Sequence, residues 1–359
     1  MNIREFAKKC GVSIATASRI LNYSLEESHA SRQTYEAVRA TAVRLGYRPN
    51  YGAKALHTYR TSCIGIIVGA TMPINSHALI KGVTDCTNTR GMSISIASCK
   101  NHPKLEAEAF ENMLFRGVDA IVWHPIFQRG EYRTRHIKRI LEKYAQRVPV
   151  VCLSGNNLEN VFHVYGDLEK NAILAAQTQL EEGCSEFGIL YSVYSVPSMD
   201  KARNAYYQTL IKNGVPREAI HQVDITADPA QYETLKEIDG LWCYYMFLLP
   251  SLMPQLSKHC KLKRIHVDGQ SLIEDYAMMK WLNYQSRGHR LEDCFAKLRY
   301  HILDGTKVSR KAAEIALSAI DSPILEPYSV VYDLEIASNQ KVDFDNILFH
   351  YNKAELSTE

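Results

Sequence analysis

Small polar side chains and one arginine recur at helical spacing near the N-terminus. Ala15, Ser18, Arg19 and Asn22 fall at i, i+3, i+4 and i+7, which is one face of a helix that Ser13 could cap. Hydroxyl and amide groups of this size bind phosphate oxygens, and an arginine can bind guanine through two parallel hydrogen bonds. The spacing therefore predicts a helix whose outer face contacts DNA.

Two further helices would position that face. The segment before Ser13 predicts an amphipathic helix that ends at Gly11, whose backbone freedom suits a tight helix–helix turn. A third helix would begin after Ser31 and end at Gly46, and Pro49 prevents its extension. The expected buried positions are Phe6, Ala7, Cys10, Ala17, Ile20, Leu21, Tyr35, Val38, Ala42 and Leu45. The sequence thus predicts a three-helix head with a helix-turn-helix.

This head resembles the LacI/GalR family of bacterial transcription regulators. The residues that carry the resemblance are GVSIATASRILN (11–22), LGYRPN (45–50) and AKALHTYRT (53–61). The resemblance implies that Ile14, Ala15 and Arg19 set the sequence preference. It implies further DNA contacts from Ser13, Thr16, Ser18, Asn22, Tyr47, Asn50 and Ala53. It also implies a short hinge helix that folds when two protomers lie side by side on DNA and presses Leu56 into the minor groove.

The head is basic, whereas the rest of the chain is slightly acidic. Residues 1–60 contain ten Lys or Arg and four Asp or Glu, a formal charge of +6, and the remaining chain carries −3. This asymmetry is expected where one end of a protein meets phosphates. The nine cysteines form no CxxC pair or metal-type spacing, which favours free thiols in a reducing cytoplasm. Because no run approaches the ~20 apolar residues of a spanning helix, no membrane contact is expected.

From residue 62 onwards, short β-rich runs alternate with helical segments. The runs are 63–69, 92–98, 119–124, 148–153, 161–167, 186–191, 219–223, 240–244, 263–268 and 329–338. Strands without in–out alternation that alternate with helices predict parallel sheets covered on both faces. Because the pattern restarts after residue 167, we expect an α/β fold with two lobes. A ligand would lie between them, at the carboxyl ends of the strands.

The resemblance implies the same architecture, a two-lobed core like that of the periplasmic sugar-binding proteins. The chain would then divide into a helix-turn-helix domain (1–47), a hinge (48–61), an effector-binding and dimerisation core (62–338) and a C-terminal extension (339–359). The implied partners are a palindromic DNA operator, a second copy in a dimer or tetramer, and a sugar or sugar derivative. Repression is the commoner outcome in that family, and the sequence leaves activation open.

The implied effector site rests on a few polar residues at strand ends. The family places aspartates where this chain has Asp167 and Asp268, and these would accept hydrogen bonds from sugar hydroxyls. Ser76, Arg203 and Tyr244 complete the implied set, although the family's arginine registers on the position next to Arg203. In the alternative, both aspartates cap helices and the tyrosine fills the core. The protein would then be a constitutive DNA binder without an effector.

Catalysis is the weaker interpretation of this sequence. No GxSxG, GxxxxGK or HExxH motif is present, and no GxGxxG follows a strand. His124 and Cys152 at predicted strand ends could form a Cys/His couple, but isolated residues of these types more often pack in a core. We therefore expect a cytoplasmic, nucleoid-associated regulator with neither cofactor nor metal. A ligand-binding module with a vestigial head is the other alternative.

Overall fold

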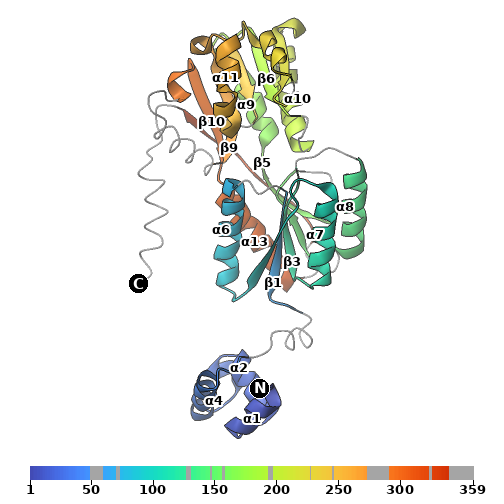
Figure 1. Ribbon diagram of the computed structural model, residues 1–359, viewed down its shortest axis with the longest axis vertical. Helices are drawn as coiled ribbons and strands as arrows, with labels where there is room; N and C mark the ends of the chain where they lie inside the picture. Colours follow the sequence, from blue (N-terminus) through green and yellow to red (C-terminus); the bar gives the residue numbers. More distant parts are fainter. Residues whose placement is uncertain are drawn as a thin grey trace. The chain divides into compact units, whose positions relative to one another are not determined.

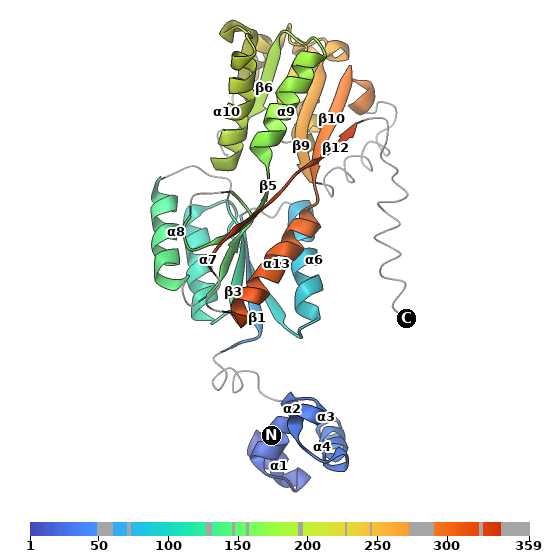
Figure 2. The ribbon, with the colours of Figure 1, turned by 180° about the vertical axis from the view of Figure 1, so that it is seen from behind.

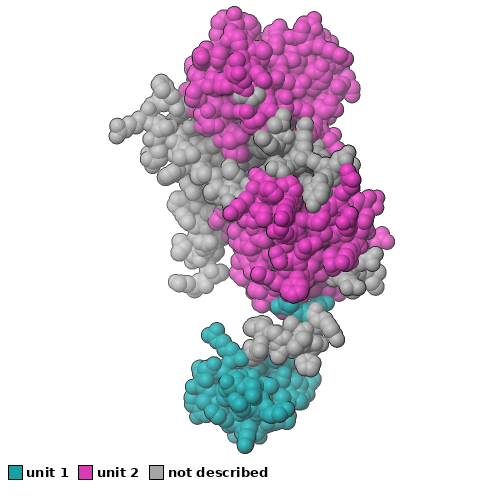
Figure 3. Space-filling view, turned by 45° about the vertical axis from the view of Figure 1, so that its right-hand side comes forward, with its two compact units in different colours: residues 1–61 teal, residues 62–359 magenta. Residues whose placement is uncertain are grey.

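The computed structural model divides into two compact units, residues 1–61 and 62–359 (Figure 3). The structure describes residues 1–48, 60–69, 73–126, 131–145, 148–155, 158–192, 197–226, 228–244, 246–272, 291–322 and 326–338. The predicted hinge contacts Asn50, Ala53 and Leu56 lie outside the described residues, as does the extension 339–359.

The first unit is a small helical domain. Its helices are α1 (Ile3–Cys10), α2 (Ile14–Asn22), α3 (Leu25–Ser28) and α4 (Arg32–Arg44). Asn2 caps α1 by accepting a hydrogen bond from the Glu5 amide at 2.9 Å, and Gly11 ends it with φ +66°, a left-handed conformation that favours glycine. The segment between α2 and α4 contains the short helix α3, which Ser24 caps.

The core of this domain follows the predicted helix faces with one exception. Its fully buried members are Phe6, Ala7, Ala17, Ile20, Val38 and Ala42. Leu45, which was expected to be buried, is 36% exposed because α4 ends at Arg44 and the backbone of Leu45 leaves helical geometry with ψ near 0°. The prediction for Leu45 was wrong because the helical period no longer applies at the cap.

The second unit contains two sheets, each of six strands within the described residues. The first sheet consists, in spatial order, of β2 (Ser93–Ser98), β1 (Cys63–Val68), β3 (Ala120–His124), β4 (Val150–Cys152), β5 (Phe162–Gly166) and β11 (Ser329–Tyr332). The second consists of β7 (Ile220–Asp224), β6 (Phe187–Tyr191), β8 (Gly240–Cys243), β9 (His266–Leu272), β10 (Lys297–Leu303) and β12 (Glu335–Ser338). Every described pairing is parallel except that of β12 with β10.

Helices cover both faces of the first sheet (Figures 1 and 2). α6 (Pro73–Asn88) and α13 (Gly305–Asp321) pack on one face, and α7 (Pro103–Phe115) and α8 (Glu131–Tyr144) on the other. α6 and α13 approach closely at Gly82, where an added Cβ would lie 2.7 Å from the Arg310 backbone nitrogen. A helix from the end of the chain therefore completes the first lobe, a long-range pairing that the sequence analysis did not identify.

The second sheet is covered in the same way. α9 (Leu168–Glu181) and α10 (Pro197–Lys212) pack on one face, and α11 (Leu249–His259) packs on the other. Short 3-10 helices fill the connections: η1 (Arg217–Ala219), η2 (Pro229–Leu235), η3 (Met246–Leu248), η4 (Leu262–Arg264) and η5 (Leu291–Asp293). Both lobes are thus α/β layers with a sheet between two sets of helices, as predicted.

The chain passes between the lobes after Gly166, after Leu303 and after Tyr332. The last passage divides the run 329–338, which was expected to be a single strand. Its first half, β11, pairs with β5 of the first sheet, and its second half, β12, pairs with β10 of the second. One extended segment therefore belongs to both lobes.

Candidate functional site

The second helix of the head, α2, has Ser13 as its N-cap. Ser13 accepts a hydrogen bond from the Thr16 amide at 3.0 Å, and the two hydroxyl oxygens lie 2.8 Å apart. This cap satisfies one of the free amides at the helix start and fixes where α2 begins. Ala17 and Ile20 are fully buried against the other helices. The opposite side of α2 therefore faces solvent.

The predicted DNA-contacting residues of α2 lie on that solvent side. Ile14 is 43% exposed, and Ala15 and Arg19 are exposed as well. Thr16, Ser18 and Asn22 are half-buried. The Asn22 amide donates to the Ser18 carbonyl at 2.8 Å, so this amide is oriented along the helix. The arrangement presents an exposed arginine beside small and apolar side chains on the solvent side of α2.

Tyr47, another predicted DNA contact, packs on the head itself. Its ring stacks on that of Phe6 with centroids 4.3 Å apart and an interplanar angle of 11°. Burial raises the pKa of Tyr47 above its usual value. The ring thus seals the core of the head, and a contact of its hydroxyl with DNA stays a prediction.

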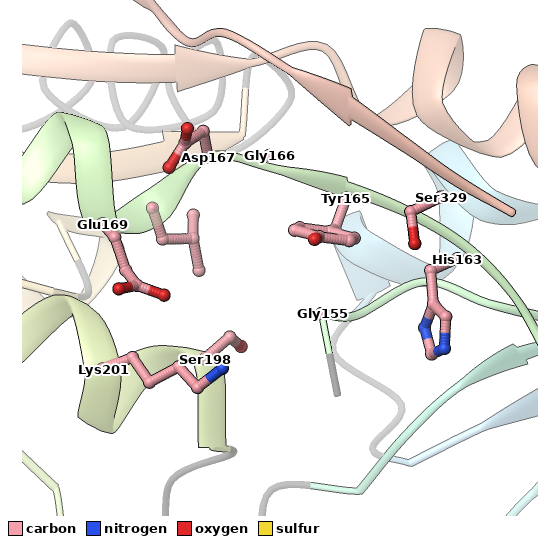
Figure 4. Close-up of a pocket in the computed structure, with 10 residues that line it drawn as sticks. Gly155, His163, Tyr165, Gly166, Asp167, Glu169, Ser198, Lys201 and Ser329 are labelled. Carbon is pink, nitrogen blue, oxygen red and sulfur yellow. The ribbon is translucent and has the colours of Figure 1, made fainter. Parts of the chain in front are cut away.

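A pocket of about 100 Å³ opens where the two lobes meet (Figure 4). It is lined by Gly155, His163, Tyr165, Gly166, Asp167, Leu168, Glu169, Ser198, Lys201 and Ser329. β5 and β11 of the first sheet form one wall, and the first turns of α9 and α10 from the second lobe form the other. The lining combines two carboxylates, one ammonium group, three hydroxyls and one imidazole, which suits a small polar molecule.

Asp167 is the predicted ligand residue that lines this pocket. Its Oδ1 atom also caps α9 by accepting a hydrogen bond from the Lys170 amide at 2.9 Å. Its backbone amide donates to the Tyr332 carbonyl at 2.8 Å, and Lys170 pairs with Asp333 at 2.8 Å. The hydrogen bond and charge of Asp333 raise the pKa of Lys170. Asp167 is therefore tied both to the pocket and to the last passage between the lobes.

Asp268, the second predicted anchor, lies inside the second lobe. Its side chain is 1% exposed and its carboxylate binds Arg299, His301 and Gln179. It sits within β9, which continues to Leu272, and it is absent from the lining of the pocket. Burial by itself would raise the pKa of Asp268, but hydrogen bonds from His301 and Arg299 hold it below its usual value.

The other predicted ligand residues are dispersed. Arg203 lies over the Tyr191 ring at 4.2 Å and 3.7 Å from Asp200. Tyr244 packs edge-to-face on Trp242, and burial raises its pKa. Ser76 belongs to α6, but its side chain lies outside the described residues. None of these three residues is among those that line the pocket as described.

The head matches a known family of regulatory proteins. Residues 2–50 match the family model described as "Bacterial regulatory proteins, lacI family". Catabolite control protein A of Staphylococcus epidermidis is 27% identical over 200 residues, a match that covers 56% of this chain and 58% of that relative. The matched part therefore spans less than two thirds of the relative's length.

Solved structures of regulators resemble the chain over most of its length. The lac repressor dimer bound to operator and an anti-inducer aligns with a TM-score of 0.73 and 16% identity, over 94% of this chain and 97% of that one. A periplasmic binding protein/LacI transcriptional regulator from Alkaliphilus metalliredigens, complexed with D-xylulofuranose, aligns with a TM-score of 0.61 and 11% identity. That alignment covers 79% of this chain and all of the other.

The head, residues 2–50, thus carries the lacI-family match, and the rest of the chain is similar to regulators of that family in fold. Its fold is a helix-turn-helix head followed by a core like that of periplasmic binding proteins. The pocket residues His163, Tyr165, Glu169, Ser198, Lys201 and Ser329 were not predicted as ligand residues.

One sequence signal could have found two of these residues. His163 and Tyr165 alternate with apolar residues in the run 161–167, so both point from the same side of β5. The His163 ring is fixed at the pocket, because its nitrogens lie 2.8 and 3.1 Å from the carbonyl oxygens of Ser154 and Leu158. Ser198 and Lys201 come from the second lobe, and only the tertiary fold brings them there.

The Cys/His couple considered from the sequence has little support as a reactive pair. Cys152 is fully buried. Burial lowers the pKa of His124 to about 4, so its ring is neutral at physiological pH. In the part of the chain that the structure describes, no His, Cys, Asp or Glu side chains cluster as a metal site. No described helix is long and apolar enough to cross a membrane.

Proposed function

We propose that this protein is a transcription regulator that binds a palindromic DNA operator as a dimer. The observation that carries the proposal is the exposed face of α2, where Arg19 stands between Ile14, Ala15 and the half-buried polar residues of the helix. The head also carries a formal charge of +6 against −3 for the rest of the chain. A groove-binding helix on a basic domain is the arrangement that sequence-specific DNA binding requires.

The division of labour follows the predicted segments. Residues 1–47 would bind DNA, residues 48–61 would form a hinge, residues 62–338 would bind an effector and dimerise, and residues 339–359 would extend the core. A single head contacts only one half-site, so a palindromic operator needs two protomers. The hinge would place Leu56 of each protomer in the minor groove, with Asn50 and Ala53 beside it. The protein would act in the cytoplasm, as a repressor.

We further propose that a small polar ligand, a sugar or sugar derivative, binds in the pocket between the lobes. Asp167 supports this assignment, because no described residue hydrogen-bonds its Oδ2 atom while Oδ1 caps α9. Glu169, Lys201 and Ser198 would supply further polar contacts, and the Tyr165 ring an apolar surface. One structural neighbour is described as complexed with a pentulose, D-xylulofuranose. Ligand binding would alter DNA affinity by favouring one arrangement of the lobes.

Asp268 is the less suitable of the two predicted anchors. Each of its oxygens already accepts two hydrogen bonds from protein groups. Tyr244 and Arg203 are not among the residues that line the pocket, so the proposed site is built on Asp167. The regulator proposal assigns no catalytic role, in keeping with the regulatory names of the relatives.

Selection of bound genomic fragments with the full-length protein tests the DNA-binding proposal. The selected fragments should share a palindrome, and affinity for it should fall steeply with salt because phosphate contacts release counterions. Light scattering of the complex should give two protomers per duplex. Sequence-independent binding, or one protomer on the duplex, would contradict the proposal.

Thermal-shift screening with a carbohydrate library tests the effector proposal. A ligand should raise the melting temperature of the wild type. Asp167→Asn should weaken the binding free energy of that ligand by about 1–3 kcal/mol, the effect of one lost charged hydrogen bond. Asp304→Asn is a matched control, because Asp304 caps α13 in the same way but does not line the pocket. If no compound stabilises the wild type, the protein is better described as a constitutive DNA binder.

A further inference from the structure

α9 meets the second sheet through a buried layer of polar side chains. We refer to this layer as the polar seam; it is formed by the buried residues Asn171, Gln179, Asp268, Gln270, Arg299 and His301, with the half-buried Glu182 at its outer end. It arises because two neighbouring strands alternate polar and apolar residues: HVDGQ in β9 and KLRYHI in β10. In register, Asp268 pairs with Arg299 and Gln270 with His301. Both strands therefore turn their polar faces to α9.

The polar groups of the seam around Asp268 and Arg299 are fully paired. The Asp268 carboxylate accepts from Arg299 Nε at 2.7 Å and Nη2 at 2.6 Å, from Gln179 Nε2 at 2.8 Å and from His301 Nε2 at 3.1 Å. Arg299 Nη1 donates to both Glu182 oxygens at 2.8 Å. A buried network whose members are all satisfied specifies one arrangement of the elements that carry it.

At the N-terminal end of α9, the seam reaches the pocket. His301 Nδ1 lies 3.0 Å from Asn171 Oδ1, and Asn171 Nδ2 donates to the backbone carbonyl of Asp167 at 2.8 Å. The Asp167 carbonyl thus accepts from the side chain of Asn171, while its own side chain caps α9 and lines the pocket. A continuous series of hydrogen bonds connects Arg299 to Asp167 through Asp268, His301 and Asn171.

The buried apolar contacts of α9 are less directional than these hydrogen bonds. The residues that it buries between the two polar ends are Ala172, Ala175 and Ala176. Methyl groups give non-directional contacts, so a helix resting on them could slide or rotate at little cost, whereas hydrogen bonds are lost when the atoms move by about 1 Å. The polar seam supplies directional contacts to the second sheet, and the Asp167 amide and Lys170 add contacts to Tyr332 and Asp333 at the first turn.

We propose that Asn171 and His301 are positioning residues for the pocket. They hold the first turn of α9 against β10 and so determine where the Asp167 carboxylate stands. The consequence for ligand affinity rests on the proposed function, but the consequence for the position of the first turn does not. Neither Asn171 nor His301 lines the pocket, so both act through Asp167.

Amide hydrogen exchange of the full-length protein tests the proposal without a ligand. Asn171→Ala and His301→Gln should each speed exchange of the amides of residues 170 and 171, which both donate to Asp167, by about tenfold, the ratio expected when a buried hydrogen bond is lost. Tyr206→Phe is the matched control. It removes the hydroxyl that donates to Gln179 Oε1 near the C-terminal end of α9, and Tyr206 is buried as Asn171 and His301 are. It should leave exchange of the amides of residues 170 and 171 unchanged even if the melting temperature falls.

Two results would overturn the proposal. Either Asn171→Ala and His301→Gln leave exchange of the first turn unchanged, or Tyr206→Phe speeds it equally, which would mean that α9 loosens as a whole. If either variant fails to fold, the other decides.

A second arm uses a panel of neutral mono- and disaccharides in calorimetry. For any sugar that binds the wild type, Asn171→Ala should raise Kd by about tenfold and Tyr206→Phe by less than about twofold. Equal losses in both variants count against positioning. If no sugar binds the wild type, the proposed effector is contradicted, and the exchange result alone decides the role of the seam.

Discussion

Asp268 and Arg299 meet through two parallel hydrogen bonds in the interior of the second lobe. Arg299 Nε lies 2.7 Å from Asp268 Oδ1, and Nη2 lies 2.6 Å from Oδ2. The aspartate side chain is 1% exposed and that of the arginine 10%. The mutual charge and hydrogen bonds raise the pKa of Arg299, although burial alone would lower it. An aspartate that family resemblance assigns to a ligand is thus engaged by the protein itself.

Removal of Arg299 should destabilise the protein strongly. Arg299→Met would leave Asp268 and Glu182 without their common partner, and a buried charge that loses its partner typically costs ~3–5 kcal/mol. Chemical denaturation of the full chain measures the change. Arg310→Ala is the matched control, since Arg310 pairs with Asp85 at 2.8 Å but is 51% exposed. It should cost less than about 1 kcal/mol. Equal losses of unfolding free energy in the two variants would mean that the buried pair stabilises the protein no more than the exposed pair does.

Acid should weaken the second lobe through Glu182. Burial raises the pKa of this carboxyl, but hydrogen bonds from Lys297, Arg299 and His266 outweigh burial and hold the pKa below its ordinary 4.5. Because the folded-state pKa is the lower one, the stabilisation is present above about pH 4.5 and is lost as pH falls through the folded-state value.

Thermal melts at a series of pH values check this expectation. The melting temperature of the wild type should decline below about pH 4.5, and Glu182→Gln should make the decline shallower. Glu36→Gln provides a comparison, because the Glu36 pair with Arg32 is exposed on α4. A Glu182→Gln variant with the acid profile of the wild type would contradict the assignment.

Arg19 should determine base preference, whereas other basic residues of the head should contribute only affinity. Arg19→Ala should cost ~1–3 kcal/mol and relax the preference at one base pair of each half-site. Arg32→Ala removes the same charge from α4, where Arg32 pairs with Glu36 at 2.9 Å. Binding-site selection with both variants measures the difference. If the two variants shift the preferred bases in the same way, Arg19 does not determine base preference by direct contact.

Three buried thiols should resist alkylation in the native protein. Burial raises the pKa of Cys99 and Cys184 to about 12 and that of Cys260 to about 11. The thiolate is the reactive form, so almost none is present at pH 8. Mass spectrometry after iodoacetamide treatment should find these cysteines unmodified until denaturant is added. Rapid labelling of any of the three in the native protein would show that its site opens to solvent.

The sequence alone determined the head and the layer type of the core. In α1 and α2 the signals are local: Asn2 and Ser13 cap, Gly11 adopts φ +66°, and the apolar period places Ala17 and Ile20 inside. The alternation of apolar runs with helices likewise depends on residues close in the chain, so the two α/β lobes could be predicted. Local hydrogen bonds and periodicity are sufficient for elements of this kind.

Only the tertiary structure decided which distant segments share a lobe and which polar residues face the pocket. The pairing of β11 with β5 and the packing of α13 on α6 join segments more than a hundred residues apart, whereas β12 pairs with the nearer strand β10. Asp167 and Asp268 have the same charge and both follow apolar runs. Yet one lines the pocket and the other is paired with Arg299, because β9 extends beyond Asp268 and β10 lies beside it. A carboxylate's role depends on the groups that surround it in space, and these are not its neighbours in sequence.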